Sequence, residues 1–372
     1  MSEIRFLPQS SVIWGKDVVA PALRQVREQF TQKPILFSIP ELVDVLEETV
    51  APGLGETCSR YLDFPPHVPD FAVEAALDAA KSAGAGLIVA CGGGSVLDAA
   101  KAVSHAHHLE TGSFLPIVAL PTTLSGSEFS HYFGITETGG GTRFKRSYAV
   151  RDTTPRHVII DPDLMRRTPR PLLLSSAIKG MDHALEGMRK VGTEHPHAIL
   201  AAQGVRTFLS VLGNWPEQLE TEDALAKGLV TLDDILALQL SAWHCYFYPA
   251  SVVYGLSHRI GHILGGTFEL PHSMTSCVTL APVMSATSAF YGSKLRPFAP
   301  EAHAAAPAEY LARVIAQTVK HLGLPSTLSD LRLAREALPE VASLLQENYP
   351  DEVRDLGPGA EEKLPPLLEA MW

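Results

Sequence analysis

Cysteine is scarce in this sequence. The four cysteines among 372 residues are Cys58, Cys91, Cys245 and Cys277. They form no CxxC pair and no spacing typical of a zinc site. A disulfide framework is not expected in a chain of this length, and the reduced thiols of the cytoplasm fit the pattern better. We therefore expect a cytoplasmic localisation.

Long apolar runs and an excess of positive charge are also absent. No stretch of about 18 apolar residues occurs, so no membrane-spanning segment is expected. The N-terminus lacks the basic start and apolar run of a signal peptide. Basic residues number 30 and acidic residues 41, which gives a net charge of −11. Nucleic acid and anionic membranes both require a broad positive field, so neither is an expected partner. A small-molecule substrate is expected instead.

The remaining composition is typical of a globular protein, with 46% hydrophobic and 19% charged residues. In the first half of the chain, short apolar runs alternate with stretches of helical periodicity. Near-continuous apolar strands with helices between them indicate a parallel sheet covered on both faces. The expected strands lie at residues 12–15, 34–40, 86–95, 115–123 and 157–164, and the expected helices at 18–30, 41–50 and 70–82.

The second half has helical periodicity and few strand signals. Its expected helices lie at residues 175–190, 197–212, 224–242 and 310–322. Prolines gather between the halves, at residues 161–171. We therefore expect an α/β N-terminal domain with a parallel sheet over residues 1–162 and an all-α C-terminal domain over residues 163–372.

A glycine-rich turn follows one of the expected strands. The segment CGGGSVLDAAK begins at Cys91 and places three glycines between a strand and a helix that we expect Ser95 to cap. Glycines let the backbone approach a pyrophosphate closely, and the first amides of the helix can meet the anion. The spacing is not the GxGxxG dinucleotide fingerprint. An ordinary strand-to-helix turn is the alternative interpretation.

A second loop, LPTTLSGSEFS, follows the next expected strand. Its hydroxyls, from Thr122, Thr123, Ser125 and Ser127, lie at the carboxyl end of that strand. Ligands bind at this edge in open α/β sheets. Serine and threonine are also common turn residues, so an ordinary turn stays open as the alternative.

Three histidines occur within fifteen residues of the second half. His258 and His262 are four residues apart and share a helix face, and His272 follows after a helix break expected at Gly265 and Gly266. Clustered neutral imidazoles can hold a divalent ion, or one of them can relay a proton. A histidine on an apolar face can also be a core residue.

A second group of polar residues is expected on one helix, in SSAIKGMDHALEGM. Lys179, His183 and Glu186 share a stripe, with Asp182 beside them. The functional interpretation is that this stripe supplies a further ligand to the histidines. The alternative is an exposed charged face, which we favour for Glu186 alone.

Together these segments resemble the iron-containing alcohol dehydrogenase family over nearly the whole chain. The resemblance rests on CGGGSVLDAAKA, LPTTLSGSE, IIDPDL with DHALEG, and GLSHRIGHILGGTFELPHSM, in that order. Within the family the maleylacetate reductase branch is most similar, through FSIPEL, HVP, FGITET and HILGGTFELPH. The resemblance implies a dehydroquinate synthase-like architecture, an active site in a cleft between the domains, NAD(H) or NADP(H) as cofactor, and a homodimer.

The resemblance also implies roles for individual residues. The implied cofactor-binding residues are Gly92, Gly93, Gly94, Ser95, Thr122, Thr123, Ser127, Lys145 and Ser38. The implied metal ligands are His183, His258 and His272, for a divalent ion such as Fe or Zn. His262 matches the proton-transfer position, and with Lys179 and His258 it completes the expected catalytic set.

The sequence departs from the family pattern at Lys179, which stands where metal-dependent members carry an aspartate. An ammonium group cannot ligate a metal, but its charge can stabilise a substrate oxygen or carboxylate instead. The maleylacetate reductase branch lacks that aspartate as well. A shifted register would place Asp182 at the ligand position. Ile39 stands where NAD-specific members often carry an aspartate, which leaves NADH and NADPH both open.

The expected function is an NAD(P)H-dependent reductase of a small unsaturated or oxo acid. The alternative is a metal-dependent alcohol dehydrogenase that interconverts a primary alcohol and an aldehyde. A lyase related to dehydroquinate synthase and a non-catalytic cofactor-binding protein are the remaining hypotheses.

Overall fold

A computed structural model describes residues 6–30, 32–55, 58–65, 68–138, 144–247 and 254–372 of the chain. The chain divides into two compact units. The first comprises Met1–Thr168 and Thr231–Gln239, and the second comprises Pro169–Val230 and Leu240–Trp372. The functional division into domains 1–162 and 163–372 stays a prediction.

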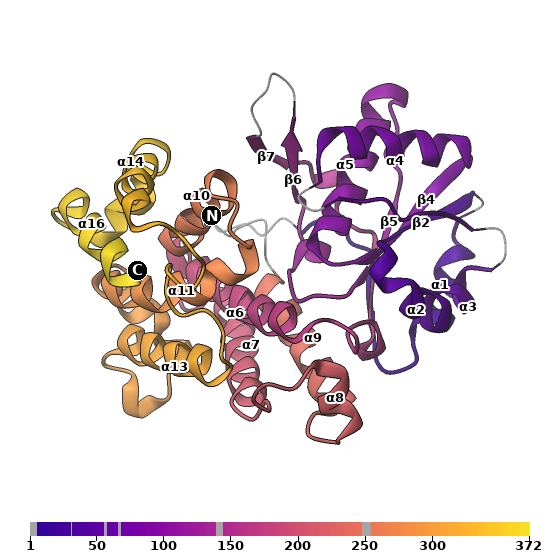
Figure 1. The fold of residues 1–372 in the computed structure, drawn as a ribbon. Coiled ribbons are helices and arrows are strands. Elements are labelled where there is room, and N and C mark those ends of the chain that lie inside the picture. Colours follow the sequence, from indigo (N-terminus) through magenta and orange to yellow (C-terminus); the bar gives the residue numbers. More distant parts are fainter. Residues whose placement is uncertain (1–5, 31, 56–57, 66–67, 139–143, 248–253) are drawn as a thin grey trace. The chain divides into compact units, whose positions relative to one another are not determined.

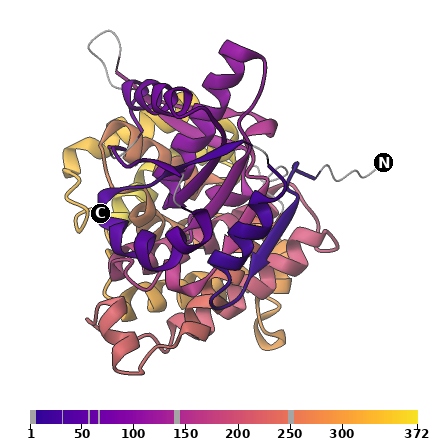
Figure 2. The same cartoon turned by 90° about the vertical axis from the view of Figure 1, so that its right-hand side faces the viewer.

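The first unit is built on a six-stranded sheet whose paired strands are all parallel. Its strands are β1 (Ser11–Trp14), β2 (Lys33–Phe37), β3 (Ser59–Tyr61), β4 (Ala85–Gly92), β5 (Ile117–Pro121) and β8 (His157–Ile160). Their order across the sheet is β1-β8-β5-β4-β2-β3. The indigo and purple strands lie side by side in Figure 2. The predicted parallel sheet is confirmed, and only the short β3 was not expected.

Helices cover both faces of this sheet. On one face lie α4 (Asp70–Ser82) and α5 (Gly94–Thr111), and on the other lies α1 (Val19–Arg27) (Figure 1). Successive side chains of each strand point to opposite faces of the sheet, so alternate residues pack into the apolar core on one face or the other. Leu87, Val89 and Cys91 of β4 belong to the core under α1. The segment after β2 continues that core as short helices: a 3-10 turn (Pro40–Leu42), α2 (Val43–Val45), a π-helical turn (Leu46–Val50) and α3 (Ala51–Leu54).

A separate two-stranded hairpin in this unit was not expected. Strands β6 (Tyr132–Glu137) and β7 (Phe144–Ala149) pair antiparallel. Phe133 lies opposite Tyr148, and their rings stack with centroids 5.3 Å apart. An aromatic cross-strand pair of this kind stabilises a hairpin. The segment FGITET, which was noted only as a family marker, therefore forms one strand of this hairpin.

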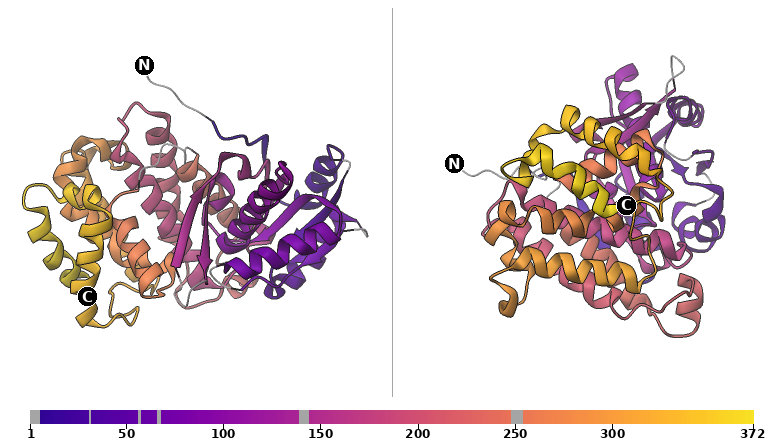
Figure 3. Two further views of the ribbon diagram at one scale, coloured as in Figure 1. Left: turned by 90° about the horizontal axis from the view of Figure 1, so that it is seen from above. Right: turned by 60° about the vertical axis from the view of Figure 1, so that its left-hand side comes forward.

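The second unit is helical, as predicted. Its main helices are α6 (Arg170–Glu186), α7 (Pro196–Leu212), α8 (Thr221–Ala226), α9 (Leu232–Tyr246), α10 (Leu256–Thr267), α11 (His272–Ala286), α13 (Pro307–His321), α14 (Leu338–Asn348) and α16 (Ala360–Met371), with α9 beginning in the first unit. Helix α6 is central, because every residue from 173 to 186 is buried. It packs against α7, α10 and α11, and the orange and yellow C-terminal helices lie together in Figure 3.

Two helix boundaries differ from expectation. The single helix expected over residues 224–242 is two helices, because Gly228 adopts a left-handed φ of +66° after α8. The break expected at Gly265 and Gly266 does not occur there, and α10 continues to Thr267. The chain reverses instead around Glu269, whose φ is 55°. Within the described residues, no helix is both long and apolar enough to cross a membrane.

Gly204 allows α7 to pack closely against α9. A Cβ atom at this position would lie 2.7 Å from Cys245 Sγ and 2.8 Å from the Ser241 carbonyl oxygen. We expect Gly204→Ala to lower the free energy of unfolding by about 1–3 kcal/mol through overpacking. Urea denaturation, followed by circular dichroism, measures this change in the free energy of unfolding.

Gly266→Ala is the matched control, because a Cβ atom there would meet nothing within 4 Å. Its unfolding free energy should be unchanged or raised by up to about 1 kcal/mol through helix propensity. Equal destabilisation by both substitutions would contradict the packing argument.

Candidate active site

The glycine turn joins β4 to α5 through closely packed backbone. Gly92 ends β4, and Gly93 is the N-cap residue of α5. A Cβ atom on Gly92 would lie 2.6 Å from Val96 Cγ2, and one on Gly93 would lie 3.0 Å from Thr123 Cγ2. Side chains are therefore disfavoured at these positions. The expectation that Ser95 caps the helix is wrong, because α5 begins at Gly94 and no side chain caps it.

The second loop lies against this turn. A Cβ atom on Gly94 would lie 3.3 Å from Ser125 Oγ. The Thr122 amide donates a hydrogen bond to the Gly92 carbonyl oxygen at 3.1 Å. Thr123 Oγ1 is buried and has no hydrogen-bond partner within the described part of the chain. An uncapped helix N-terminus beside a buried, unpaired hydroxyl is suited to an anion.

Ser127 and Ser38, two expected cofactor residues, have partners within the protein. Ser127 Oγ donates to Asp98 Oδ1 at 2.6 Å and accepts from Lys101 Nζ at 2.7 Å. Ser38 Oγ donates to the Cys91 carbonyl oxygen at 2.7 Å. Sequence reasoning missed Asp98 and Lys101, although both lie in CGGGSVLDAAK with the i,i+3 spacing of a helical ion pair.

Lys145, the remaining expected cofactor residue, lies on strand β7, opposite Thr136 of β6. Its side chain lies outside the described part of the structure. The proposed contact with a nicotinamide ribose stays a prediction.

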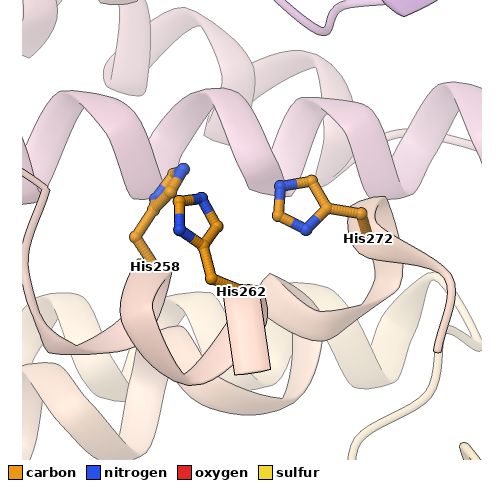
Figure 4. Close-up of side chains that lie close together, drawn as sticks. All are labelled: His258, His262 and His272. Carbon is orange, nitrogen blue, oxygen red and sulfur yellow. The ribbon is translucent and has the colours of Figure 1, made fainter. Parts of the chain in front are cut away.

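The histidines His258, His262 and His272 gather as predicted (Figure 4). His258 and His262 lie one turn apart on α10, and His272 is the first residue of α11. Their potential ligand atoms all lie within 4.8 Å of one another. The His262 ring is 5.7 Å from that of His258 and 5.5 Å from that of His272, between ring centroids.

His183 approaches this cluster from α6. Its ring centroid is 4.1 Å from that of His258, and the Tyr254 ring stacks on His258 at 4.4 Å. Burial is the main effect that lowers the pKa of His183 well below its usual range, and the nearby His258 and Lys179 add to it. Burial and Lys179 lower the pKa of His258 in the same direction. Both imidazoles are therefore neutral at pH 7.

The polar stripe of α6 is buried, so its interpretation as an exposed charged face is wrong. The Lys179 side chain is only 6% exposed, and its Nζ lies 3.9 Å from Asp182 Oδ2. The same Asp182 oxygen accepts hydrogen bonds from Ser257 Oγ, at 3.2 Å, and from Ser276 Oγ. A buried charge requires this kind of compensation. The ammonium and carboxylate of α6 are thus held as a pair.

Glu186 holds the helix that carries two of the histidines. Its Oε2 accepts from the backbone amides of Gly255 and His258, at 2.9 and 3.1 Å, and its Oε1 accepts from the Ser257 amide at 2.7 Å. These amides belong to the N-terminus of α10, where backbone donors lack helical partners and the helix dipole favours negative charge. Glu186 therefore caps α10 from a neighbouring helix.

Comparison with known proteins places these features in one family. The family model described as "Iron-containing alcohol dehydrogenase" matches residues 9–162, and its C-terminal counterpart, "Fe-containing alcohol dehydrogenase family, C-terminal", matches residues 174–351. The chain belongs to the iron-containing alcohol dehydrogenase family. It is accordingly an oxidoreductase.

Individual relatives agree with this assignment. The maleylacetate reductase of Pseudomonas aeruginosa is 30% identical over 342 residues, which is 91% of this chain and 90% of that protein. The crystal structure of maleylacetate reductase from Rhizobium sp. strain MTP-10005 aligns with a TM-score of 0.81 at 23% identity and covers 100% of this chain and 99% of the other. Sulfoacetaldehyde reductase from Bifidobacterium kashiwanohense, in complex with NAD+, aligns with a TM-score of 0.81 at 18% identity and covers 100% and 99% of the two chains. The structural likenesses establish the fold.

The metal-ligand positions of the iron-containing alcohol dehydrogenase family do not fit a divalent ion in this chain. The expected set was His183, His258 and His272, but His183 is in neither group of residues whose ligand atoms lie within 4.8 Å of one another among the described residues. The fourth position carries the Lys179 ammonium, whose charge acts on both His183 and His258. A cation at this place repels a metal ion.

Two other sets of potential ligands occur among the described residues. One consists of Asp182, Glu186 and His258, but hydrogen bonds already occupy Asp182 Oδ2 and both Glu186 oxygens. The other consists of His258, His262 and His272. Imidazole nitrogens are common ligands of divalent ions.

The second loop contains one carboxyl group, that of Glu128, with a strongly shifted pKa. Burial raises the pKa of Glu128 to about 7. A carboxyl group with a raised pKa stabilises the fold while protonated, and this contribution is lost as the pH rises through the folded-state pKa. We expect the unfolding free energy of the wild type, relative to Glu128→Gln, to fall by up to about 3 kcal/mol between pH 5 and pH 8.

Urea denaturation of both proteins across this pH range measures the difference. Glu74→Gln, at an exposed position of α4, is the control and should show no such difference. A constant difference between the wild type and Glu128→Gln would mean that Glu128 does not titrate in this range.

Proposed function

We propose that this oxidoreductase uses NADH or NADPH to reduce a small unsaturated or oxo acid. The name of the maleylacetate reductases to which it is similar supports this substrate class. The observation that carries the proposal is the buried Lys179–Asp182 pair beside the histidines. It supplies a fixed positive charge where metal-dependent relatives are expected to hold an ion. The 30% identity to a maleylacetate reductase over most of the chain supports the same substrate class.

The first unit supplies the features needed to hold the cofactor. The glycines let the backbone approach a pyrophosphate closely beside the uncapped N-terminus of α5, and Thr123 offers an unpaired buried hydroxyl within the described part of the chain. A reduced nicotinamide, when bound, supplies the hydride. The proposal assigns the cofactor to this turn. Roles for Ser38, Ser95, Thr122 and Lys145 in cofactor binding belong to it as well.

In the second unit, Lys179 is suited to bind the substrate. Its ammonium attracts a carboxylate or carbonyl oxygen and stabilises the negative charge that develops there when the neighbouring carbon accepts hydride. Asp182, held by Ser257 and Ser276, keeps the ammonium in place. Preorganised charge of this kind requires no rearrangement during the reaction, which is the source of its catalytic effect.

His262 is suited to complete the reduction by donating a proton. It is half-buried, unlike His258 and His183, so solvent can reprotonate it after each turnover. One hydride and one proton together convert a carbonyl to an alcohol, or a carbon–carbon double bond to a single bond. His258 and His183, both neutral, line the site and orient the substrate without adding charge.

A second function is favoured by the His258, His262 and His272 cluster. Their close approach suits a divalent ion, which would support a metal-dependent alcohol dehydrogenase acting on a primary alcohol or aldehyde. His262 would then be a ligand and would be unable to transfer a proton. The two functions therefore make opposite demands on the same imidazole.

A substrate panel separates the two functions. Purified protein is mixed with NADH or NADPH and with maleylacetate, other small oxo acids, or aldehydes, with and without a strong chelator. We expect the absorbance of the reduced cofactor to fall with an oxo acid and the rate to be unchanged by the chelator. Stoichiometric bound metal together with activity lost in chelator would support the alcohol dehydrogenase instead.

Substitution of Lys179 tests the role of its charge. We expect Lys179→Met to lower kcat by about 10²–10³-fold, because a preorganised positive charge is lost from the reaction site. Lys227→Met, which removes an exposed lysine of the same unit, is the control and should retain full activity. Steady-state kinetics measure both.

Lys179→Asp tests the metal argument without relying on activity. It removes the repelling charge and adds a carboxylate, so we expect it to retain Zn²⁺ or Fe²⁺ through dialysis while the wild type does not. Elemental analysis of the two proteins measures this. Equal metal content would show that Lys179 does not determine metal binding.

A further inference from the structure

Lys101 is a fully buried lysine on α5, about two helical turns after the start of that helix at Gly94. Its side chain is 0% exposed. A buried ammonium is costly unless it is paired and hydrogen-bonded. Lys101 Nζ donates to Ser127 Oγ and to the Tyr132 carbonyl oxygen, both at 2.7 Å, and lies 3.5 Å from Asp98 Oδ1. The cost of burial is therefore met by groups on three different segments.

Asp98 completes the same network with both of its oxygens. Its Oδ1 accepts from Ser127 Oγ at 2.6 Å, and its Oδ2 accepts from the Gly134 amide at 3.1 Å. Gly134 lies on β6, Ser127 in the second loop, and Asp98 on α5. One ion pair on a helix thus holds both the second loop and the hairpin in place.

The position of this network gives it a consequence for ligand binding. The loop held at Ser127 is the one that presents Thr123 and Ser125 to Gly93 and Gly94. Asp98 and Lys101 lie on the helix whose first turn is the proposed anion site. The anion site consists of a helix end and a loop from another strand, so its geometry depends on what ties the loop to the helix. Charge-assisted hydrogen bonds are the strong connections available here.

We propose that Asp98 and Lys101 are positioning residues for the cofactor, which act by fixing Ser127 and hence the second loop against the N-terminus of α5. Ser127 then serves the site by holding the loop, rather than by donating its hydroxyl to the cofactor. This inference rests on the proposed use of NADH or NADPH.

Direct binding of the reduced cofactor tests the proposal. The Kd of the full-length protein for NADH and NADPH is measured by titration, with kcat at saturating cofactor and the thermal melting curve recorded in parallel. We expect Asp98→Asn and Ser127→Ala to raise the Kd by about 10- to 100-fold, as loss of a hydrogen bond to a charged group implies. Ser127→Thr, which keeps the hydroxyl, should bind within about threefold of the wild type. The kcat of each variant at saturation should change by less than about threefold, because the chemical groups are untouched.

Asp70→Asn is the matched control for a merely structural effect. Asp70 accepts from the Thr138 hydroxyl at 2.6 Å and from the Thr138 amide at 3.0 Å, which are the same kinds of bond that Asp98 makes. We expect this substitution to leave the Kd unchanged, even if it lowers the melting temperature.

The outcomes separate the inference from the function on which it rests. If the wild type binds neither cofactor, the proposed function and this inference are both overturned. If the wild type binds but Ser127→Ala and folded Asp98→Asn bind equally well, only the inference is overturned. The inference is also overturned if Asp70→Asn weakens cofactor binding as much as Asp98→Asn does. If Asp98→Asn does not fold, the contrast between Ser127→Ala and Ser127→Thr decides.

Discussion

The burial of charge on α6 is the constraint on which the helical unit depends. A helix that is buried along most of its length would ordinarily be apolar, yet α6 carries Lys179, Asp182 and Glu186. Because all three side chains are buried, each needs polar partners within the protein. Asp182 compensates Lys179, and the N-terminus of α10 compensates Glu186. The fold of this unit is therefore arranged around polar contacts that a purely apolar core would not need.

This arrangement links the architecture of the helical unit to its chemistry. Glu186 determines where α10 begins, and α10 carries His258 and His262. Asp182 contacts Ser257 at the start of the same helix and Ser276 on α11, which also carries His272. The groups that compensate buried charge are thus attached to the helices that bear the imidazoles. A change in the charge of α6 would consequently move the reactive groups as well as destabilise the core.

The α/β unit uses buried charge in a similar way. Lys101 and Asp98 on α5 bind both a loop and a hairpin strand from other parts of the chain. Glycines let the backbone of the turn approach an anion closely, whereas the ion pair provides the fixed geometry. A loop without fixed geometry would bind an anion weakly, because ordering the loop on binding costs free energy.

Much of this organisation could be predicted from the sequence. Apolar strands alternating with helices indicated the parallel sheet, and helical periodicity indicated α4 from residue 70 to residue 82. The clustering of three histidines followed from their spacing on one helix and across a short turn. The hairpin of β6 and β7 and the extension of α10 through its glycines were missed, because local propensity carries no information on what a segment packs against.

The residues of the candidate site, too, were predictable from the sequence only in part. Sequence determined which chemical groups are available: the glycine turn, the hydroxyl loop, the imidazoles and a lysine where an aspartate was expected. Only the tertiary structure decided their environment, because burial and pairing depend on segments far apart in the chain. It buried Glu186 as a cap, when periodicity suggested an exposed face, and it assigned the Ser127 hydroxyl to an internal ion pair. The sequence identifies each ionisable side chain, but the effect of its charge depends on the groups that replace water around it in the folded protein.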